Sequence, residues 1–368
     1  MKEHRDKMNN KKNIRVLAMY LPQFHPIPEN NEWWGEGFTE WTNIQRENIF
    51  SDGMKPLNDN YYNLLNKETV EWQTKLMNEY GVYGFCYYHY WFKGKKLLEK
   101  PAENLLNWKD IDQKFCFFWA NHSWYRSWEG TKEVLIEQEY GTEEDWQNHF
   151  DYLKTFFTDK RYIKINNKPV FIIFNDFKQK DKIFEFFNNK SREAGFNGIY
   201  IIESIISNHK NISNNAEAFF LREPGLAYGI YYRRNIFVRS LLKIERIIKK
   251  VNGKRTFKMR NVKADKLFDI SVKYFKNIKS NKKCYPGAFA MWDNTYRHSE
   301  RGYKIYAPSQ DKFVLYLKEM KELAKARNLD FLFFNAWNEW AEGMILEPSN
   351  LHGYRFLEGI KEVFGRIE

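Results

Sequence analysis

The sequence has few cysteines, no long hydrophobic run and no apolar leader. Its 368 residues include only Cys86, Cys116 and Cys284, all in apolar stretches. This small number excludes a disulfide framework and a multi-cysteine zinc site, so we expect buried, reduced thiols. No window of about 18 apolar residues occurs and residues 1–13 are polar, which predicts neither a transmembrane helix nor a signal peptide. We therefore expect a cytoplasmic protein, soluble or peripheral to the inner face of the membrane.

Motifs for nucleotide and metal binding are also missing. The only formal glycine-rich candidate, residues 35–37, does not follow a direct strand-to-helix turn. A doubly wound nucleotide-binding sheet is therefore the less favoured fold. No HExxH or His-x-His pattern occurs, so we predict no metal and no cofactor. The Asp-x-Asp sequence at 110–112 precedes an expected strand, which would put it at the end of a barrel opposite the active site.

Positive charge is concentrated in one segment. The formal net charge is +12, but residues 233–283 contain 18 Lys and Arg against three acidic residues, so the rest of the chain sums to −3. A basic amphipathic helix in this segment could lie on an anionic membrane or bind a diphosphate-linked lipid carrier. The alternative is a helix packed on the domain with a solvated basic face. No motif supports nucleic-acid binding, and we predict none. The apolar stripe of this predicted helix is Ile236, Leu241, Ile244, Ile248 and Val251.

Aromatic residues are abundant, with 13 Trp, 23 Tyr and 31 Phe. Two explanations are open: a large aromatic core, or a site in which rings stack on sugar faces. A long loop after the first predicted strand carries Trp33, Trp34 and Trp41, and these rings suit either role.

Eight apolar, β-rich runs occur along the chain, and helical patterns separate most of them. Their near-continuous hydrophobicity is typical of parallel strands buried on both faces. The sequence thus predicts an α/β fold, a (β/α)8 TIM barrel. We expect a polar tail at 1–13, one domain at 14–366, and a basic helical insertion at about 226–283 between strands 6 and 7. The predicted strands are 15–21, 82–88, 114–120, 169–174, 198–202, 216–221, 287–292 and 331–337; the helices lie near 70–80, 142–157, 179–194, 313–324 and 351–366.

Polar and aromatic residues follow every predicted strand. Any one of them could simply mark where the chain leaves the core, and Arg222 is one such residue after strand 6. Together, at the carboxyl end where barrel active sites lie, they suit a ligand with many hydroxyls. The candidate substrate-binding residues are Tyr20, Gln23, His25, Trp34, Glu40, Trp41, Tyr88, His89, Trp91, Asn121, His122, Trp124, Arg126, Glu203, Glu223, Trp292, Asp293, Asn294, Asn338 and Glu347.

The segment after the last strand carries the candidate catalytic pair, Glu339 and Glu342. Carboxylates three residues apart point to opposite faces of a strand, but they share a face if the chain turns, and Gly343 favours a turn. Two close carboxylates cannot both ionise cheaply, so one should keep a proton at neutral pH. Cleavage of a glycosidic bond needs such an acid together with a carboxylate base or nucleophile. Two exposed glutamates on a loop are the alternative. Glu347 is expected to shape the loop or to contact substrate.

Residues 334–349, FNAWNEWAEGMILEPS, resemble the C-terminal motif of glycoside hydrolase family 99. Residues 20–44, YLPQFHPIPENNEWWGEGFTEWTNI, look like the hallmark of the WbsX-like proteins, a group usually labelled glycosyltransferase and linked to bacterial surface polysaccharides. Three further blocks, GFCYYHYWF, FFWANHSW and PGAFAMWDNTYRHS, are similar to other parts of these families. The resemblance spans about residues 14–365, except for the basic insertion.

The resemblance implies a (β/α)8 barrel with chemistry at an anomeric carbon. In family 99 the first Glu of the E-W-x-E motif takes the proton of a sugar 2-hydroxyl, and the second is general acid and then base, with net retention; the matching residues are Glu339 and Glu342. Ala341 stands where family 99 typically has His, so the resemblance does not extend to a mannoside preference. It implies a transferase of O-antigen, lipopolysaccharide or capsule assembly that acts on a glycan or lipid-linked oligosaccharide. The alternatives are a retaining endo-glycosidase and a non-catalytic sugar-binding barrel.

Overall fold

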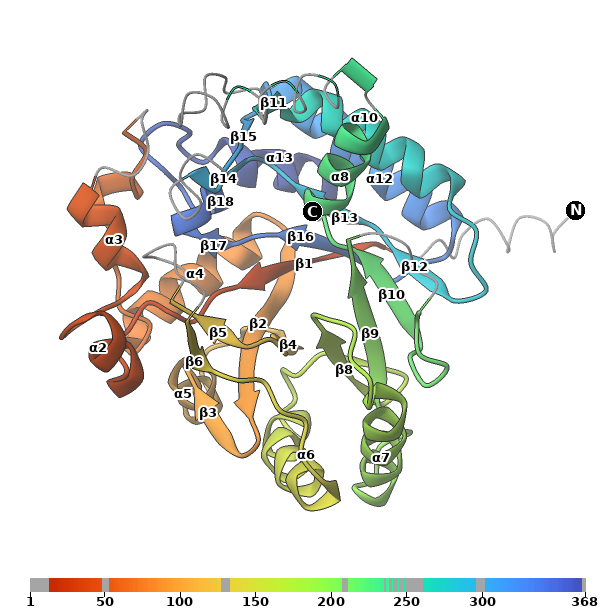
Figure 1. The fold of residues 1–368 in the computed structure, drawn as a ribbon. Coiled ribbons are helices and arrows are strands. Elements are labelled where there is room, and N and C mark those ends of the chain that lie inside the picture. Colours follow the sequence, from red (N-terminus) through yellow and green to blue (C-terminus); the bar gives the residue numbers. More distant parts are fainter. Residues whose placement is uncertain are drawn as a thin grey trace, which may run out of the picture.

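A parallel sheet curls into a nearly closed, TIM-barrel-like wall (Figure 1). The computed structural model describes residues 13–47, 53–126, 133–206, 211–234, 261–295 and 302–365, together with residues 236, 237, 240, 244 and 248. The strands follow the order β12-β10-β9-β8-β4-β2-β1-β16-β13, and every neighbouring pair is parallel. All eight predicted strands overlap a member of this sheet. The members are β1 (Arg15–Tyr20), β2 (Val82–Phe92), β4 (Phe115–Trp119), β8 (Lys168–Ile173), β9 (Tyr200–Ile205), β10 (Ala218–Leu221), β12 (Lys283–Tyr285), β13 (Gly287–Phe289) and β16 (Phe331–Asn335).

The segment that contains β12 and β13 brings the two ends of the sheet together. Only Pro286 separates these strands; β12 pairs with β10, whereas β13 pairs with β16. The Pro286 carbonyl also accepts a hydrogen bond of 3.0 Å from Phe333 N–H. A side chain at Gly287 would collide with the carbonyl oxygen of Leu221, so only glycine lets the backbones approach this closely.

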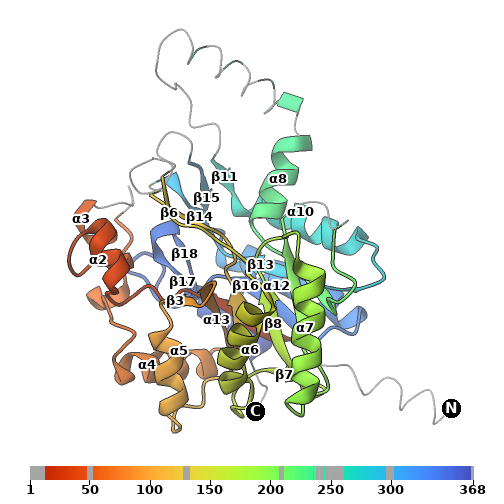
Figure 2. The same cartoon turned by 60° about the horizontal axis from the view of Figure 1, so that its bottom comes forward.

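Helices surround the sheet, as Figures 1 and 2 show from two sides. The five helices predicted near 70–80, 142–157, 179–194, 313–324 and 351–366 are present, although their boundaries shift by a few residues. A capping box precedes the helix Glu143–Phe157, because an Asp145 carboxylate oxygen accepts the Thr142 N–H at 2.8 Å. The helices are α2 (Pro28–Trp34), α3 (Glu40–Glu47), α4 (Lys67–Glu79), α5 (Lys100–Asn107), α6 (Glu143–Phe157), α7 (Lys180–Glu193), α8 (Gly225–Arg234), α10 (Ala264–Asn277), α12 (Gln310–Ala326) and α13 (Arg355–Phe364), with short 3-10 turns η1 (Leu57–Asp59) and η4 (Trp340–Glu342).

Short strands form smaller ladders beside the main sheet. A hairpin of two of them, β17 and β18, follows directly after β16, and β14 pairs with β15 near it in the chain. The short strands are β3 (Lys95–Leu97), β5 (Trp124–Tyr125), β6 (Val134–Ile136), β7 (Lys164–Ile165), β11 (Val262–Lys263), β14 (Trp292–Asp293), β15 (Lys304–Tyr306), β17 (Asn338–Glu339) and β18 (Met344–Ile345).

Aromatic side chains dominate the core, so the first of the two explanations, a large aromatic core, accounts for many of them. Tyr20, Tyr87 and Phe85 on β1 and β2 are fully buried, and their rings pack 4.3 to 4.9 Å apart around Tyr20. The three cysteines are buried and form no disulfide. No helix in the described ranges is long and apolar enough to cross a membrane.

Between β10 and β12 the structure describes α8, β11 and α10. Most of the predicted amphipathic helix, including Leu241 and Val251, lies outside the described residues. The short connection from β9 to β10 contains no helix in its described parts, 206 and 211–217.

Candidate active site

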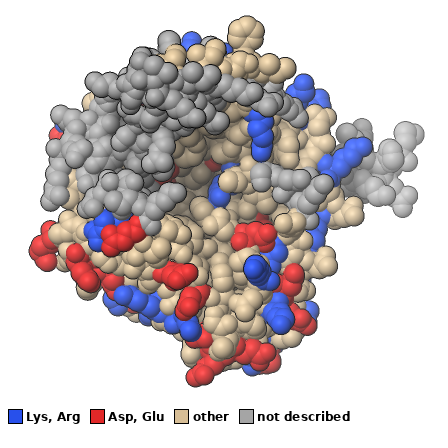
Figure 3. Space-filling view, in the orientation of Figure 1, with Lys and Arg blue, Asp and Glu red and all other residues tan. Residues whose placement is uncertain are grey.

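A cavity of about 530 Å³ lies at the carboxyl ends of the barrel strands. This is the end that carries the active site in TIM-barrel enzymes, and the volume suits a small ligand. The surface is hollowed near the centre of the view in Figure 3. Residues at the ends of seven sheet strands, from β1 to β16, contribute to the lining. It includes Gln23, Asn30, Trp34, Tyr88, His122, Trp124, Phe174, Ile206, Arg222, Glu223, Trp292, Asn335, Glu339 and Glu342.

Glu339 and Glu342 line the same cavity because the chain turns between them. Glu339 ends β17 and Glu342 ends the 3-10 turn η4. Gly343 then takes the left-handed conformation at φ 56°, which favours glycine, and β18 returns antiparallel to β17. The spacing had predicted this arrangement only on condition of a turn, and the turn is present.

Glu342 is held by an indole. Trp292 Nε1 donates a hydrogen bond of 2.9 Å to Glu342 Oε2. The Trp292 ring lines the cavity and packs edge-on against Tyr303, with centroids 4.9 Å apart. This bond holds one carboxylate oxygen of Glu342 in place. Because the carboxylate is planar and rigid, the direction of its other oxygen relative to the cavity is then restricted as well.

Below the turn, the buried Glu347 accepts four hydrogen bonds of 2.7 to 2.9 Å. The donors are Trp337 Nε1, Trp340 Nε1, Tyr62 OH and Gln73 Nε2. Burial raises the pKa of this carboxyl to about 7, against the opposing effect of the four donors. Glu347 does not belong to the described cavity lining, so it supports the loop, as one of its two predicted roles requires.

Two more predicted residues position the turn. Asn338 accepts a hydrogen bond from Leu21 N–H at 2.7 Å and donates one to the Leu21 carbonyl at 3.0 Å, which ties β17 to the end of β1. Glu40 accepts the Ala341 N–H at 3.3 Å. Asn338 and Glu40 therefore contact the segment of the candidate pair from two sides, although neither lines the cavity.

Tyr88 belongs to the cavity lining, and charges of both signs act on its hydroxyl. Burial raises the pKa of its hydroxyl well above 10, the negative charges of Glu339 and Glu342 raise it further, and Arg222 opposes them. The hydroxyl thus stays protonated and can donate a hydrogen bond inside the cavity.

Strand alternation decides which predicted residues reach the cavity. On β2, Tyr88 and Tyr90 face it, so His89 and Trp91 point the other way. There His89 Nε2 lies 2.9 Å from His149 Nε2, and burial lowers the pKa of His89 to about 3. His89 is therefore neutral and is not placed to contact Glu339 or Glu342. In all, Gln23, Trp34, Tyr88, His122, Trp124, Glu223, Trp292, Glu339 and Glu342 line the cavity, whereas Tyr20, His25, Glu40, Trp41, His89, Trp91, Asn121, Arg126, Glu203, Asp293, Asn294, Asn338 and Glu347 do not.

Several of the latter group have protein partners instead. Glu203 forms a buried ion pair with Lys180 at 2.8 Å. Asp293 pairs with Lys304 at 3.1 Å, and Asn121 exchanges hydrogen bonds with the Asn175 backbone. Tyr20 OH donates to Gln73. These contacts explain the polar residues as parts of the loop framework.

Several residues of the cavity lining are absent from the predicted set, among them Asn30 and Arg222. Asn30 on α2 is fully buried, and neither its amide oxygen nor its nitrogen has a hydrogen-bond partner. Arg222 was recognised as a strand-end residue but not selected as a contact. A polar residue amid PENNEWW was the only sequence signal for Asn30, because the short helix there was not predicted. Within the described ranges no group of three or more His, Cys, Asp or Glu is arranged to hold a metal ion.

The family model of glycosyltransferase WbsX matches residues 16–360. The chain belongs to the WbsX glycosyltransferase family. A relative is the uncharacterized protein WxcX of Xanthomonas campestris pv. campestris, strain B100, which is 30% identical over 367 residues. Its counterpart from a second strain is 29% identical. Each alignment covers 95% of this chain and 50% of the relative, so the chain spans about half the length of these proteins.

Two solved structures share the fold of this WbsX family member at low sequence identity. One is described as a glycoside hydrolase-like protein, with a TM-score of 0.58, 14% identity, and coverage of 96% of this chain and 95% of the other. The second is the GH99 endo-alpha-mannosidase from Bacteroides thetaiotaomicron, with a TM-score of 0.53, 12% identity, and coverage of 95% and 96%. These similarities confirm the TIM-barrel-like fold that the family resemblance implied.

Proposed function

We propose that this chain is a glycosyltransferase of bacterial surface polysaccharide assembly, of the O-antigen or capsule type, that acts through Glu339 and Glu342. The observation that carries the proposal is that both carboxylates line one cavity at the carboxyl ends of the barrel strands. Membership of the WbsX family supports it. The substrate is a glycan or a lipid-linked oligosaccharide, and the reaction takes place on the cytoplasmic side, where such precursors are assembled.

The chemistry follows from two carboxyl groups with different roles. Glu339 takes the proton of the sugar 2-hydroxyl, whose oxygen attacks the anomeric carbon, while Glu342 gives its proton to the departing oxygen. An acceptor hydroxyl then attacks the same carbon and loses its proton to Glu342, while the bond from that carbon to the 2-oxygen breaks and the 2-oxygen recovers a proton from Glu339. Two displacements leave the anomeric configuration retained. Trp292 keeps Glu342 in place through both steps by its hydrogen bond.

A mass spectrum of lipid-linked glycans from the native host tests the proposal. Wild type is compared with Glu342→Gln and with a control, Glu358→Gln, which alters an exposed residue on α13. A transferase predicts intermediates that stop one residue short in Glu342→Gln alone. Normal glycans in that strain would contradict any catalytic role in their assembly.

A retaining endo-glycosidase is the second candidate, favoured by the fold shared with the GH99 endo-alpha-mannosidase. The two functions differ only in the acceptor, which is water for the hydrolase and a sugar hydroxyl for the transferase. In the same spectrum a hydrolase predicts longer, uncut chains. A sugar-binding barrel without catalysis predicts that Glu342→Gln changes no glycan at all.

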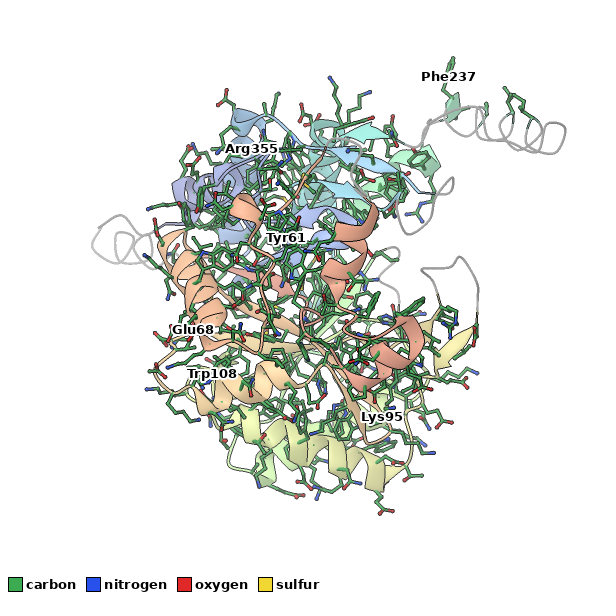
Figure 4. All side chains as sticks on the ribbon, turned by 90° about the vertical axis from the view of Figure 1, so that its left-hand side faces the viewer. Tyr61, Glu68, Lys95, Trp108, Phe237 and Arg355 are labelled. Carbon is green, nitrogen blue, oxygen red and sulfur yellow. The ribbon has the colours of Figure 1, made fainter. Side chains whose placement is uncertain are left out.

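We also propose that residues 233–283 contact an anionic membrane. Ile236 and Phe237 are 75% and 80% exposed, and Phe237 stands away from the barrel in Figure 4. Lys273 on α10 and Lys279 just after it line a groove together with Ile236 and Phe237. Basic groups beside exposed apolar side chains suit anionic headgroups. Co-sedimentation with anionic but not zwitterionic vesicles, weakened in Phe237→Ser, is the expected result; equal binding to both vesicle types would contradict it.

A further inference from the structure

Arg222 is the one Lys or Arg in the described lining of the cavity. Its backbone N–H is fixed at the end of β10 by a hydrogen bond of 2.8 Å to the Ile205 carbonyl. The guanidinium carbon lies 3.7 Å from the centroid of the Phe174 ring, and Nη1 donates a long bond of 3.3 Å to the Phe174 carbonyl. The ring covers one face of the guanidinium, so its position is set before any ligand binds.

No carboxylate of the described chain neutralises this cation. The adjacent Glu223 is committed elsewhere: its Oε2 accepts Ala227 N–H and its Oε1 accepts Ser271 OH, both at 2.8 Å. A guanidinium carries five N–H groups, and the described protein satisfies one of them. A largely desolvated charge without a counter-ion is unfavourable, so the site gains most from a ligand that brings a negative charge.

The cavity is also polarised. Glu339 and Glu342 line the cavity together with Arg222, so groups of opposite charge face the same space. Neither acid forms an ion pair with Arg222. A sugar at the acids that carries an anionic group would therefore bind in one preferred direction, with that group toward Arg222.

We propose that Arg222 binds an oxyanion of the substrate, a carboxylate or a phosphate, so that the substrate of this cavity is a negatively charged glycoside. The inference deepens the proposed function and rests on it, because the proposed reaction is what identifies the substrate as a glycoside. Planar guanidinium groups bind both oxyanions through two parallel N–H···O bonds. The hydroxyls of a neutral sugar can accept hydrogen bonds from Arg222 but cannot compensate its charge.

Binding of three small probes to the full chain tests the inference. The probes are glucose, glucuronate and glucose 1-phosphate, and the readout is the change in tryptophan fluorescence, to which Trp34, Trp124 and Trp292 of the cavity contribute, checked by calorimetry. We expect a charged probe to bind wild type about 10-fold more tightly than glucose, and Arg222→Gln to lose this preference. Tighter binding of glucuronate alone identifies a carboxylate, and of glucose 1-phosphate alone a phosphate.

Two further variants make the result specific. Arg222→Lys keeps the charge but not the two-pronged geometry, so part of the preference should remain. Arg192→Gln removes an exposed arginine on α7 and should change nothing. Equal affinity of wild type for all three probes, or an unchanged preference in Arg222→Gln, would overturn the inference.

The probe measurement also separates this inference from the proposed function. Glu342→Gln should keep the preference for charged probes, because Glu342 forms no ion pair with Arg222. If wild type prefers charged probes but the host glycans are unaltered in Glu342→Gln, the anion site at Arg222 is supported and the proposed transferase function is contradicted. Altered glycans in Glu342→Gln without charge preference in wild type would do the reverse.

Discussion

Trp292 Nε1 donates a hydrogen bond to Glu342 Oε2 across 2.9 Å, although 50 residues separate them in sequence. The bond joins β14 to the turn η4 at the cavity wall. A general acid must present its proton along a defined line, and small displacements of such groups reduce rates strongly. The contact therefore gives Trp292 a positioning role, beyond the substrate contact that the sequence predicted.

Replacing Trp292 with Phe tests that role. The variant keeps an aromatic ring beside Tyr303 but loses the N–H, so we expect turnover to fall about 10-fold, the typical effect of one hydrogen bond to a charged group. Formation of the lipid-linked product per cell, measured by mass spectrometry, gives the readout. Trp108→Phe, which alters a residue outside the described cavity lining, is the matched control and should leave the product unchanged. Unchanged product formation in Trp292→Phe would show that the bond does not position Glu342.

A second prediction concerns the stability of the catalytic turn. Glu347→Gln replaces one of the two accepting oxygens by an NH₂ group. That group then faces two donors, either Trp337 and Gln73 or Trp340 and Tyr62. A buried network that is only partly satisfied is costly, so we expect the free energy of unfolding to fall by about 3 kcal/mol. Thermal and urea unfolding measure this loss. The exposed Glu358→Gln should unfold like wild type, and a similar small loss in both variants would contradict the network.

Much of the barrel was predictable because its signal is local. Near-continuous apolar runs mark buried parallel strands, and the strands at 82–88 and 331–337 needed no further information. The turn at Gly343 was predictable for the same reason, since glycine accommodates the left-handed conformation found there.

The direction of each strand-end side chain was not predictable. Tyr88 and His89 are neighbours in sequence, yet Tyr88 lines the cavity and His89 lies against His149. A shift of one residue in register reverses the two faces, and no local pattern in an all-apolar strand reports it. Glu347 illustrates a second limit, because its four donors come from three separate segments of the chain.

Asn30 leads to a third prediction, in which binding and stability respond differently. Its buried amide has no protein partner and lines the cavity, so it is available to a ligand hydroxyl. Asn30→Ala should leave the melting temperature unchanged or raise it, because an unsatisfied buried amide is removed. Product formation at limiting substrate should fall about 10-fold. The neighbouring Asn31, whose side chain bonds Glu36 and Gly37, is the control; Asn31→Ala should affect the loop but not the cavity.

Glu223 gives a prediction about pH. Burial raises the pKa of this carboxyl from 4.5 to about 7, against hydrogen bonds from Ala227 N–H and Ser271 OH. The folded state therefore holds this proton more tightly than the unfolded chain, and its contribution to stability is lost as the pH rises from about 4.5 to about 7. Glu223→Gln keeps an uncharged side chain of the same shape at every pH. We expect the variant to match wild type near pH 4 and to exceed its free energy of unfolding by up to about 3 kcal/mol near pH 8. Urea unfolding across this range measures the free energy of unfolding of both proteins, and the difference between them removes the contributions of the other titrating groups. A difference that stays constant with pH would show that Glu223 ionises as freely in the folded chain as in the unfolded one.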